Sequence, residues 1–468
     1  MKICIVAEGC YPYVVGGVSS WIHSMIRSFP EHEYVVLAIV ADRKNSGRFK
    51  YELPENVTEV HEVYLNDDDW GKENRKRLKK NEYEALRSII CNDNPDWETF
   101  MDILSKPEFS YNDLVMGMDF YEAVKEAYRL RYTDVPFVDF LWTMRSMYLP
   151  LVLVMSADLP KADVYHCVAT GYAGVLGAMA KIRYGSKLLI SEHGIYTRER
   201  EEELIKATWV QGLYKDIWID QFRKMSKLAY DKADVITSLY QYASELQAEL
   251  GAPKKKLRVT PNGVDASRFE NIPGKTKEDE AYVNIGAIVR VTPIKDIKTM
   301  IRAYALAKHK VPRLKLWIMG PCDEDEEYAK ECFDIVEAMD LQDVVFTDRV
   351  DVTQYMGRMD FTVLTSISEG QPLTILEGYA AKKPVVATDV GNCRGLILGE
   401  DDEFGKAGIL THIMNVEEIA NAFVEMALNP EQTEAMGEAG YNRLMKKYLL
   451  HQMKETYKTI YDELDGDK

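Results

Sequence analysis

The stretch MKICIVAEGCYPYVVGGVSSWIHSMIRSF (residues 1–29) decides the fold class. Residues 3–7 are an apolar run that predicts a buried strand, and Gly16 and Gly17 follow in a loop. A second strand is predicted at residues 34–40. Between the two strands, apolar residues recur at the spacing of one helical face: Val18, Trp21, Ile22, Met25, Ile26 and Phe29. Strand, glycine loop, helix and strand in this order indicate a doubly wound parallel sheet.

The alternation of strands and helices continues in two series along the chain. Further strands of the first series are predicted at residues 164–166, 188–190, 235–237 and 257–260. Strands of the second series are predicted at residues 282–288, 315–319, 344–347, 361–364, 384–388 and 408–410. Two such series predict an α/β protein with two Rossmann-like domains that face a central cleft, where ligands bind beyond the carboxyl ends of the strands.

The domain boundaries follow from changes in this rhythm. Residues 1–270 are predicted as the N-terminal domain, with charged helical stretches at about 42–150 forming a helical insertion. The polar segment 271–281 has the composition of an interdomain linker. Residues 282–450 form the C-terminal domain, and 451–468 an amphipathic helix that we expect to pack back on the N-terminal domain. The insertion fits either a docking surface for partners or an elaboration of its domain.

Composition excludes several classes of protein. Of 468 residues, 58 are basic and 75 acidic, a net charge of −17 that argues against nucleic acid as a partner. The seven cysteines are scattered without a CxxC pair or a Cys/His ladder, which favours a reduced, cytoplasmic setting over a disulfide framework or a zinc site. The longest apolar stretch, residues 147–155, contains Pro150 and is shorter than the roughly 20 residues of a membrane span, so we expect no transmembrane segment.

The strongest chemical signal is a pair of glutamates directly after the predicted strand 361–364. Glu369 and Glu377 stand eight residues apart in SEGQPLTILE (residues 368–377), with Gly370 in the turn between them. A helix that begins near Leu373 would direct free amides toward an anion such as a diphosphate, and the glutamates could accept hydrogen bonds from sugar and ribose hydroxyls. The same residues also fit a plain helix N-terminus with an acidic cap.

Two cations follow the first strand of the second series. Arg290 and Lys295 could bracket a diphosphate and neutralise the charge that develops on a leaving nucleotide, or they could be solvated surface residues. In the first half, Gly16 and Gly17 leave the backbone bare for close approach of a ligand, and His193 lies just past a strand end. A lone histidine and a glycine pair at a strand-to-helix turn are each also common as structural features.

Other reactive motifs are absent from the sequence. The dinucleotide fingerprint, the P-loop and the serine-hydrolase elbow do not occur. Two acidic triplets, at residues 67–69 and 323–325, lack the ligand pattern of a cation site, and we interpret them as solvated or capping segments. No metal site is predicted.

Together these motifs resemble the GT4 family of retaining glycosyltransferases, whose GT-B fold holds a nucleotide sugar between two Rossmann-like domains. Within that family the chain is most similar to the PelF branch, which builds Pel exopolysaccharide. The resemblance is carried in order by residues 8–21, 191–201, 261–265, 320–328, 369–377 and 388–394. The family's usual Gly-Phe-Gly after the first glutamate is replaced here by Gly370-Gln371-Pro372, a change that is itself PelF-like.

The resemblance implies a role for each motif residue. Glu369 would hold the hydroxyls of the donor sugar, Glu377 the ribose, and His193 would lie beside the anomeric carbon. Val350 would recognise the base through its backbone. The diphosphate would be contacted by Arg290 and Lys295, with help from Gly17 and from the amides of Leu373 and Thr374. Gly16 and Gly370 would be further substrate-binding residues.

The resemblance implies a cytoplasmic retaining hexosyltransferase that needs no metal or other cofactor. It would transfer a hexose or N-acetylhexosamine from a UDP-sugar to a growing exopolysaccharide of Pel type. Its partners would be the UDP-sugar, a saccharide acceptor and membrane-embedded export components at the inner face of the membrane. Two alternatives share the same cleft: a UDP-sugar 2-epimerase, and a non-catalytic UDP-sugar-sensing subunit of a polysaccharide synthase. A phosphorylase would need a pyridoxal-bearing lysine, which no residue marks.

Overall fold

A computed structural model describes residues 1–66, 76–106, 109–400 and 402–466. These residues form two compact units. The first consists of Met1–Val259 together with Thr459–Lys468, and the second of Thr260–Lys458. The chain therefore passes between the units twice.

The first unit is built on a parallel sheet of seven strands in the order β3-β2-β1-β4-β5-β6-β7. The inner strand β1 is buried from Ile3 to Ala7, as the apolar run at the start of the chain predicts. The strand order reverses between β1 and β4, the arrangement of a doubly wound sheet. The strands are β1 (Lys2–Glu8), β2 (Glu33–Val40), β3 (Val57–Tyr64), β4 (Val164–Cys167), β5 (Lys187–Glu192), β6 (Val235–Ser238) and β7 (Leu257–Val259).

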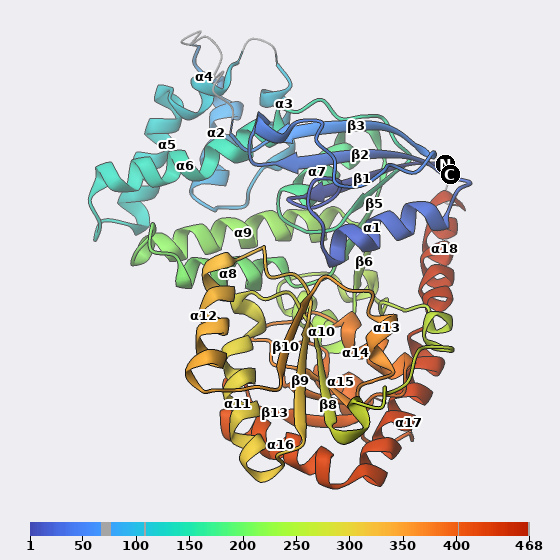
Figure 1. Cartoon of the computed structure of the whole chain (residues 1–468). Helices are drawn as coiled ribbons and strands as arrows, with labels where there is room; N and C mark the ends of the chain where they lie inside the picture. Colours follow the sequence, from blue (N-terminus) through green and yellow to red (C-terminus); the bar gives the residue numbers. More distant parts are fainter. Residues whose placement is uncertain (67–75, 107–108, 401, 467–468) are drawn as a thin grey trace. The chain divides into compact units, whose positions relative to one another are not determined.

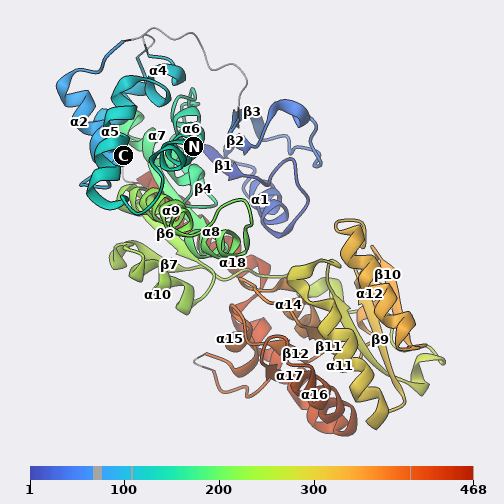
Figure 2. The ribbon, with the colours of Figure 1, turned by 90° about the vertical axis from the view of Figure 1, so that its left-hand side faces the viewer.

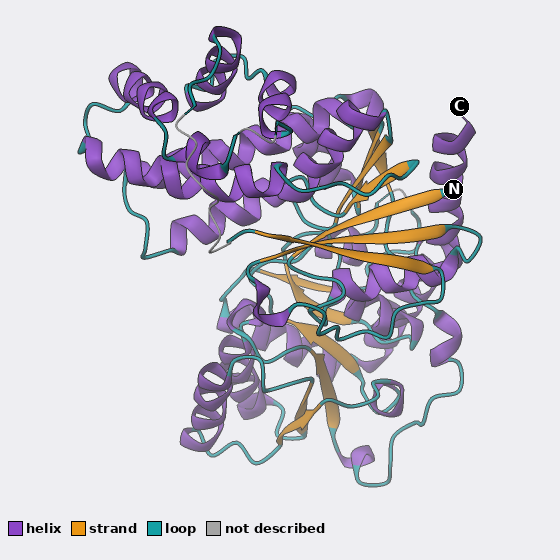
Figure 3. Ribbon diagram, turned by 90° about the horizontal axis from the view of Figure 1, so that it is seen from above, coloured by secondary structure: helices purple, strands orange, loops and turns teal. Residues whose placement is uncertain are grey.

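Helices cover this sheet, as expected of buried parallel strands. Figure 3 shows them in purple around the strands, and α7 packs on both β1 and β4. The helices are α1 (Gly17–Ser28), α2 (Lys80–Ile90), α3 (Trp97–Leu104), α4 (Tyr111–Val115), α5 (Met118–Arg131), α6 (Phe137–Met155), α7 (Tyr172–Tyr184), α8 (Tyr196–Lys206), α9 (Leu213–Lys232) and α10 (Gln241–Glu249).

The segment 42–150 is only partly helical. Helices α2 to α6 gather together at one end of the first unit (Figures 1 and 2), but the segment also contributes the edge strand β3. The prediction of a helical insertion from residue 42 was therefore wrong for its first part. Strand β3 pairs on one side only, and of its eight residues Val63 alone is buried. Its polar, partly exposed side chains lack the apolar run that marks the inner strands.

The second unit has a parallel sheet of six strands in the order β10-β9-β8-β11-β12-β13. Its order also reverses once, between β8 and β11, so both sheets are of Rossmann type and the predicted fold class is confirmed. The strands are β8 (Val283–Ile288), β9 (Leu314–Met319), β10 (Val344–Asp348), β11 (Phe361–Leu364), β12 (Val385–Thr388) and β13 (Gly408–Thr411).

Helices pack around this second sheet as well. Figure 1 shows α11 and α12 beside β8 to β10, in yellow and orange. The helices are α11 (Ile297–Lys310), α12 (Glu326–Ala338), α13 (Thr353–Met356), α14 (Leu373–Ala380), α15 (Cys393–Leu398), α16 (Val416–Leu428), α17 (Pro430–Lys447) and α18 (Leu450–Gly466), the last of which continues into the first unit.

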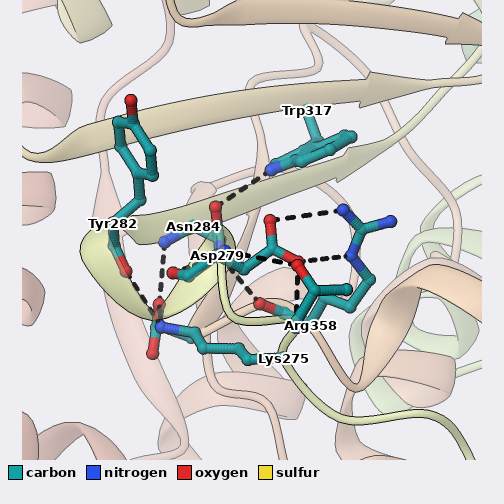
Figure 4. Close-up of polar contacts among 8 residues, drawn as sticks. Lys275, Asp279, Tyr282, Asn284, Trp317 and Arg358 are labelled. Carbon is teal, nitrogen blue, oxygen red and sulfur yellow. Dashed lines mark hydrogen bonds and ion pairs between the residues drawn. The ribbon is translucent and has the colours of Figure 1, made fainter.

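The segment 271–281, predicted as a linker, is tied into the second unit (Figure 4). Asp279 is buried and accepts two hydrogen bonds from the guanidinium of Arg358, at 2.8 and 3.2 Å. Although burial by itself would raise the pKa of Asp279, this guanidinium and hydrogen bonds from Thr276 together lower it to about 2. The chain instead changes units between Val259 and Thr260. A polar composition cannot distinguish a free linker from a segment held by a buried ion pair.

The end of helix α18 contacts the sheet of the first unit. Tyr461 of α18 hydrogen-bonds to the buried His166 on β4, with 2.7 Å between the hydroxyl and Nδ1.

Among the described helices, α6 is the one that is long and apolar enough to cross a membrane. Four residues of its last turns, Leu151, Val152, Val154 and Met155, belong to the core of the first unit. One helix of this kind is weak evidence for a membrane span, because buried core helices can be equally long and apolar.

Candidate functional site

The predicted site residues of the second unit gather at one edge of its sheet. Arg290 and Lys295 follow β8, and Glu369 follows β11. Strands β8 and β11 are hydrogen-bonded neighbours at the point where the strand order reverses. In open parallel sheets this point, at the carboxyl ends of the strands, is where ligands bind. The topology therefore brings these three side chains to the expected position.

Glu369 and Lys295 are in direct contact. Nζ of Lys295 lies 2.5 Å from Oε1 of Glu369, and the two side chains are only 17% and 12% exposed. The hydroxyl of Ser366 donates to the same oxygen, also at 2.5 Å. A carboxylate that accepts from an ammonium group and a hydroxyl forms charge-assisted hydrogen bonds, which are stronger than neutral ones. The pair is thus a defined feature of the site and no loose surface contact.

Arg290 has a different partner. Its guanidinium lies 2.7 Å from a carboxylate oxygen of Glu324, which stands in the loop between β9 and α12. The Arg290 side chain is about half exposed. In this structure the two cations predicted to bind the diphosphate, Arg290 and Lys295, are therefore paired with carboxylates of the chain itself.

Helix α14 begins at Leu373, in agreement with the predicted helix start near this residue. Its N-cap is Pro372, and no side chain caps it, so the amides of Leu373 and Thr374 are among those left without helical partners. Glu377 lies one turn further along the helix. Burial raises the pKa of its carboxyl, and the positive charge of Arg268 offsets part of that shift. Helix α14 thus presents free amides and a carboxyl near its N-terminus.

The loop between Glu369 and α14 is closely packed. The carbonyl of Gly370 accepts a hydrogen bond from the backbone N–H of Asn392 at 2.8 Å. The side chain of Gln371, which stands where the GT4 family has a phenylalanine, accepts one from the backbone N–H of Asn262 at 2.8 Å. A residue outside the motif therefore anchors each of these two positions.

Val350 lies beyond β10, in the loop that leads to α13. It is partly buried against a small apolar cluster of Trp317, Met319 and Met359, which also includes Ile288 at the end of β8. This packing gives Val350 a fixed position in the second unit. Its predicted backbone contact with a base stays a prediction.

In the first unit the predicted residues are Gly16, Gly17 and His193. Gly17 is the first residue of α1, and a Cβ on either glycine would meet no atom within 4 Å. His193 follows β5, and its ring lies 4.4 Å, centroid to centroid, from that of Trp21 on α1. Burial lowers the pKa of His193 to about 4, so its imidazole is neutral at pH 7. Its Nε2 is shielded from solvent and makes no hydrogen bond to the described residues.

The acidic triplets give two different outcomes. Residues 67–69 lie outside the described part of the chain. In the second triplet, Asp325 caps α12 by accepting a hydrogen bond from the N–H of Tyr328 at 3.0 Å, which confirms the capping interpretation, whereas Glu324 binds Arg290. In the described ranges no group of three or more His, Cys, Asp or Glu side chains could hold a metal ion. All seven cysteines fall within those ranges and are free thiols.

Sequence reasoning gave no role to two residues that belong to this site. Ser366 holds Glu369, and Glu324 holds Arg290. Ser366 stands three residues before Glu369, just ahead of the motif, so its position was a usable signal. No pattern along the chain joins Glu324 to Arg290, because they meet only when β9 pairs with β8.

Comparison with known proteins agrees with this geometry. Residues 281–429, which contain the Arg290, Lys295 and Glu369 positions, match the family "Glycosyl transferases group 1". Residues 1–255 match a family described as a domain of unknown function, DUF3492. In structure, the chain is similar to HepE of Anabaena in complex with UDP-glucose, with a TM-score of 0.62 over 99% of this chain and 100% of that one. At 17% identity this likeness shows the fold, which is GT-B.

Curated relatives point in the same direction. The chain is 32% identical to an uncharacterised glycosyltransferase of Methanocaldococcus jannaschii over 307 residues, 64% of this chain and 76% of that protein. It is 24% identical over 369 residues, 74% of this chain and 91% of the relative, to a Bacillus subtilis protein that carries the name of a glycosyltransferase, EpsD. Several further relatives are matched over about half of their own length. The chain belongs to the group 1 family of glycosyltransferases, with DUF3492 as its N-terminal part.

Proposed function

We propose that this chain is a retaining hexosyltransferase of GT4 type that uses a UDP-sugar as donor. The observation that carries the proposal is the contact between Lys295 and Glu369 at the reversal point of the second sheet, with Arg290 on the same edge. A carboxylate there can accept hydrogen bonds from sugar hydroxyls, while the cations can bind a diphosphate. The unpaired amides of α14 at Leu373 and Thr374 add donors for an anion.

The proposed reaction breaks the bond between the anomeric carbon and the diphosphate oxygen. The acceptor hydroxyl attacks from the same face, its proton passes to the leaving phosphate oxygen, and the new glycosidic bond keeps the anomeric configuration. Arg290 and Lys295 would stabilise the negative charge on departing UDP, the task that a metal performs in other transferases, so we expect no metal requirement. His193, neutral at pH 7, would lie beside the anomeric carbon without adding charge.

The remaining parts of the proposal concern the substrates. HepE has been solved with UDP-glucose, and a Staphylococcus aureus relative is named a poly(ribitol-phosphate) α-N-acetylglucosaminyltransferase. These names support a UDP-hexose or UDP-N-acetylhexosamine as donor. The PelF-like segments, among them Gly370-Gln371-Pro372, support a growing exopolysaccharide of Pel type as acceptor. We place the enzyme in the cytoplasm, recruited by membrane-embedded export components, and its free thiols fit that compartment.

The test is UDP release from a panel of UDP-sugars by wild type, Glu369→Ala and a control, Glu438→Ala. Glu438 is an exposed carboxylate on α17 paired with Lys382, far along the chain from the motif. We expect one UDP-sugar to give release that Glu369→Ala loses and Glu438→Ala keeps. Conversion of UDP-N-acetylglucosamine to its 2-epimer without release would instead identify an epimerase. Binding of UDP-sugar without turnover at any acceptor would favour the sensing subunit.

A further inference from the structure

Glu369 stands in a segment that has no regular secondary structure of its own. Residues 365–372 connect β11 to α14, so neither a strand nor a helix fixes the direction of its carboxylate. The backbone of this segment is nevertheless tied down at both ends. The N–H of Ile367 donates to the carbonyl of Ile294 at 2.9 Å, and the N–H of Asn392 donates to the carbonyl of Gly370 at 2.8 Å. These bonds hold the main chain but leave the side chain of Glu369 free to rotate.

Ser366 supplies the contact that orients this side chain. Ser366 is fully buried, and its hydroxyl donates to Oε1 of Glu369 at 2.5 Å. The carbonyl of Ser366 in turn accepts a hydrogen bond from the hydroxyl of Thr388, at the end of β12, at 2.6 Å. Ser366 is thus held from the neighbouring strand while it holds Glu369.

The two oxygens of Glu369 are used unequally. Oε1 accepts from both Ser366 and Lys295, each at 2.5 Å, whereas no residue of the described chain donates to Oε2. A carboxylate oxygen that is partly exposed and has no protein donor is free to accept hydrogen bonds from a ligand. The backbone of Lys295 is fixed as well, because the hydroxyl of Thr365 donates to its carbonyl oxygen at 2.9 Å.

We propose that Ser366 is a positioning residue of the donor site, which turns Glu369 so that Oε2 accepts hydrogen bonds from hydroxyls of the donor sugar. Because Ser366 shares Oε1 with Lys295, it also keeps Glu369 oriented when the ammonium group of Lys295 turns toward the diphosphate. This inference rests on the proposed function, and it deepens that function by separating recognition of the sugar from recognition of UDP.

The test compares Ser366→Ala with wild type by two measurements: kcat/KM for the UDP-sugar that wild type uses, and the affinities for that UDP-sugar and for UDP alone. A hydrogen bond to a charged group predicts a fall in kcat/KM of roughly tenfold to a hundredfold. Affinity for UDP alone should stay within about twofold, since UDP has no sugar for Glu369 to hold. The control is Ser88→Ala, another buried serine with a hydroxyl that donates within its own element, here to the carbonyl of Ala85 on α2. It should change neither quantity.

Donor analogues that each lack one sugar hydroxyl give a sharper measurement. With the analogue that lacks the hydroxyl bound by Oε2, wild type and Ser366→Ala should have nearly equal kcat/KM, because the interaction is already missing. A uniform loss across all analogues would mean that Ser366 only supports the fold and would overturn the proposal. Ser366→Cys nearly keeps the side-chain volume and is measured in parallel, so that a poorly folded alanine variant still leaves a result. It should lose part of the activity.

The outcomes for the two proposals are distinguishable. If Ser366→Ala binds and turns over the UDP-sugar as wild type does, the positioning role is wrong while the transferase assignment stands. If wild type binds neither UDP nor any UDP-sugar, the proposed function fails and this inference fails with it. Selective loss of sugar-dependent affinity in Ser366→Ala supports both, even before an acceptor is found.

Discussion

Arg290 and Glu324 form an ion pair of 2.7 Å between the loops that follow β8 and β9. The side chains are 48% and 29% exposed, and pairs of this kind contribute little to stability. The pair matters for a different reason. If Arg290 binds the donor diphosphate as proposed, the diphosphate must share or displace the carboxylate of Glu324, so this contact would compete with the donor.

Glu324→Gln should therefore strengthen donor binding. Removing the competing charge is expected to lower KM for the UDP-sugar by up to about fivefold, the range of exposed ion pairs. Steady-state kinetics at two salt concentrations measure the effect, which should shrink at high salt. Asp323→Asn is the matched control, because it removes a neighbouring charge whose side chain is 70% exposed and lies 3.8 Å from Arg349. An unchanged or higher KM in Glu324→Gln would contradict the competition.

Arg443 should be the most sensitive charged residue for stability in the second unit. Its side chain and that of Asp402 are fully buried and joined by two hydrogen bonds of 2.8 and 2.9 Å, and hydrogen bonds from Arg443 lower the pKa of Asp402. Arg443→Met leaves a buried carboxylate without this partner and is expected to cost about 3–5 kcal/mol of unfolding free energy. Urea denaturation measures this loss of unfolding free energy. Lys382→Met, which breaks an exposed pair with Glu438, should cost less than about 1 kcal/mol.

The sequence predicted best those elements whose signal is local. Strand β11 was predicted with its observed bounds (Phe361–Leu364) and α14 with a start near Leu373, because a buried apolar run and a turn with Gly370 and Pro372 mark them. That Lys295 and Glu369 lie near each other follows from the order of the strands in the sheet. Parallel strands place their carboxyl ends at one edge, so residues that follow neighbouring strands come together.

Features that depend on three-dimensional partners could not be predicted. Strand β3 was missed because its partly exposed side chains carry no apolar run. The segment around Asp279 was taken for a linker, because Arg358, the partner of this buried carboxylate, lies 79 residues away. The shared oxygen of Glu369 is a matter of side-chain rotamers, which spacing along the chain does not encode. The relation between Ser366 and Glu369 therefore became visible only in the structure.

Lys224 on α9 predicts a pH dependence of the first unit's stability. Its ammonium group donates to the carbonyl of Ile89 at 2.6 Å and to the hydroxyl of Tyr148 at 2.9 Å, and burial lowers its pKa to about 7, an effect that Asp220 partly offsets. Between pH 7 and the ordinary lysine pKa of 10.5, the unfolded chain binds more protons at this residue than the folded chain. Stability should therefore rise with pH in that window, and the slope should vanish below pH 7.

Lys224→Met isolates this effect. The bond from the Tyr148 hydroxyl to the Ile89 carbonyl, 2.9 Å long, does not depend on the lysine and should survive the change. Between pH 7.5 and 9, the unfolding free energy of wild type should rise by up to about 2 kcal/mol more than that of the variant. Denaturant titrations at several pH values measure the difference. Equal slopes for the two proteins would show that Lys224 titrates normally in the folded state.

Gly391 should be essential for the conformation of the Glu369 loop. It adopts a left-handed φ of +53°, and a Cβ there would lie 2.1 Å from the carbonyl oxygen of Glu369 and 2.5 Å from that of Gly370. An alanine would thus incur backbone strain and also push against the main chain of the loop that carries the site. Gly391→Ala is expected to lower kcat/KM at least tenfold, because small displacements of a positioning loop have large effects on rate.

Gly405 offers a control that separates strain from displacement. It also has a left-handed φ, +86°, but a Cβ there would meet no atom within 4 Å. Gly405→Ala should therefore cost roughly 1–2 kcal/mol of unfolding free energy from strain alone and keep the kcat/KM of wild type. Unfolding and kinetics are measured on both variants. If Gly405→Ala loses as much activity as Gly391→Ala, general destabilisation explains the loss. If only Gly391→Ala loses activity, the contact between Gly391 and Glu369 controls the position of the carboxylate.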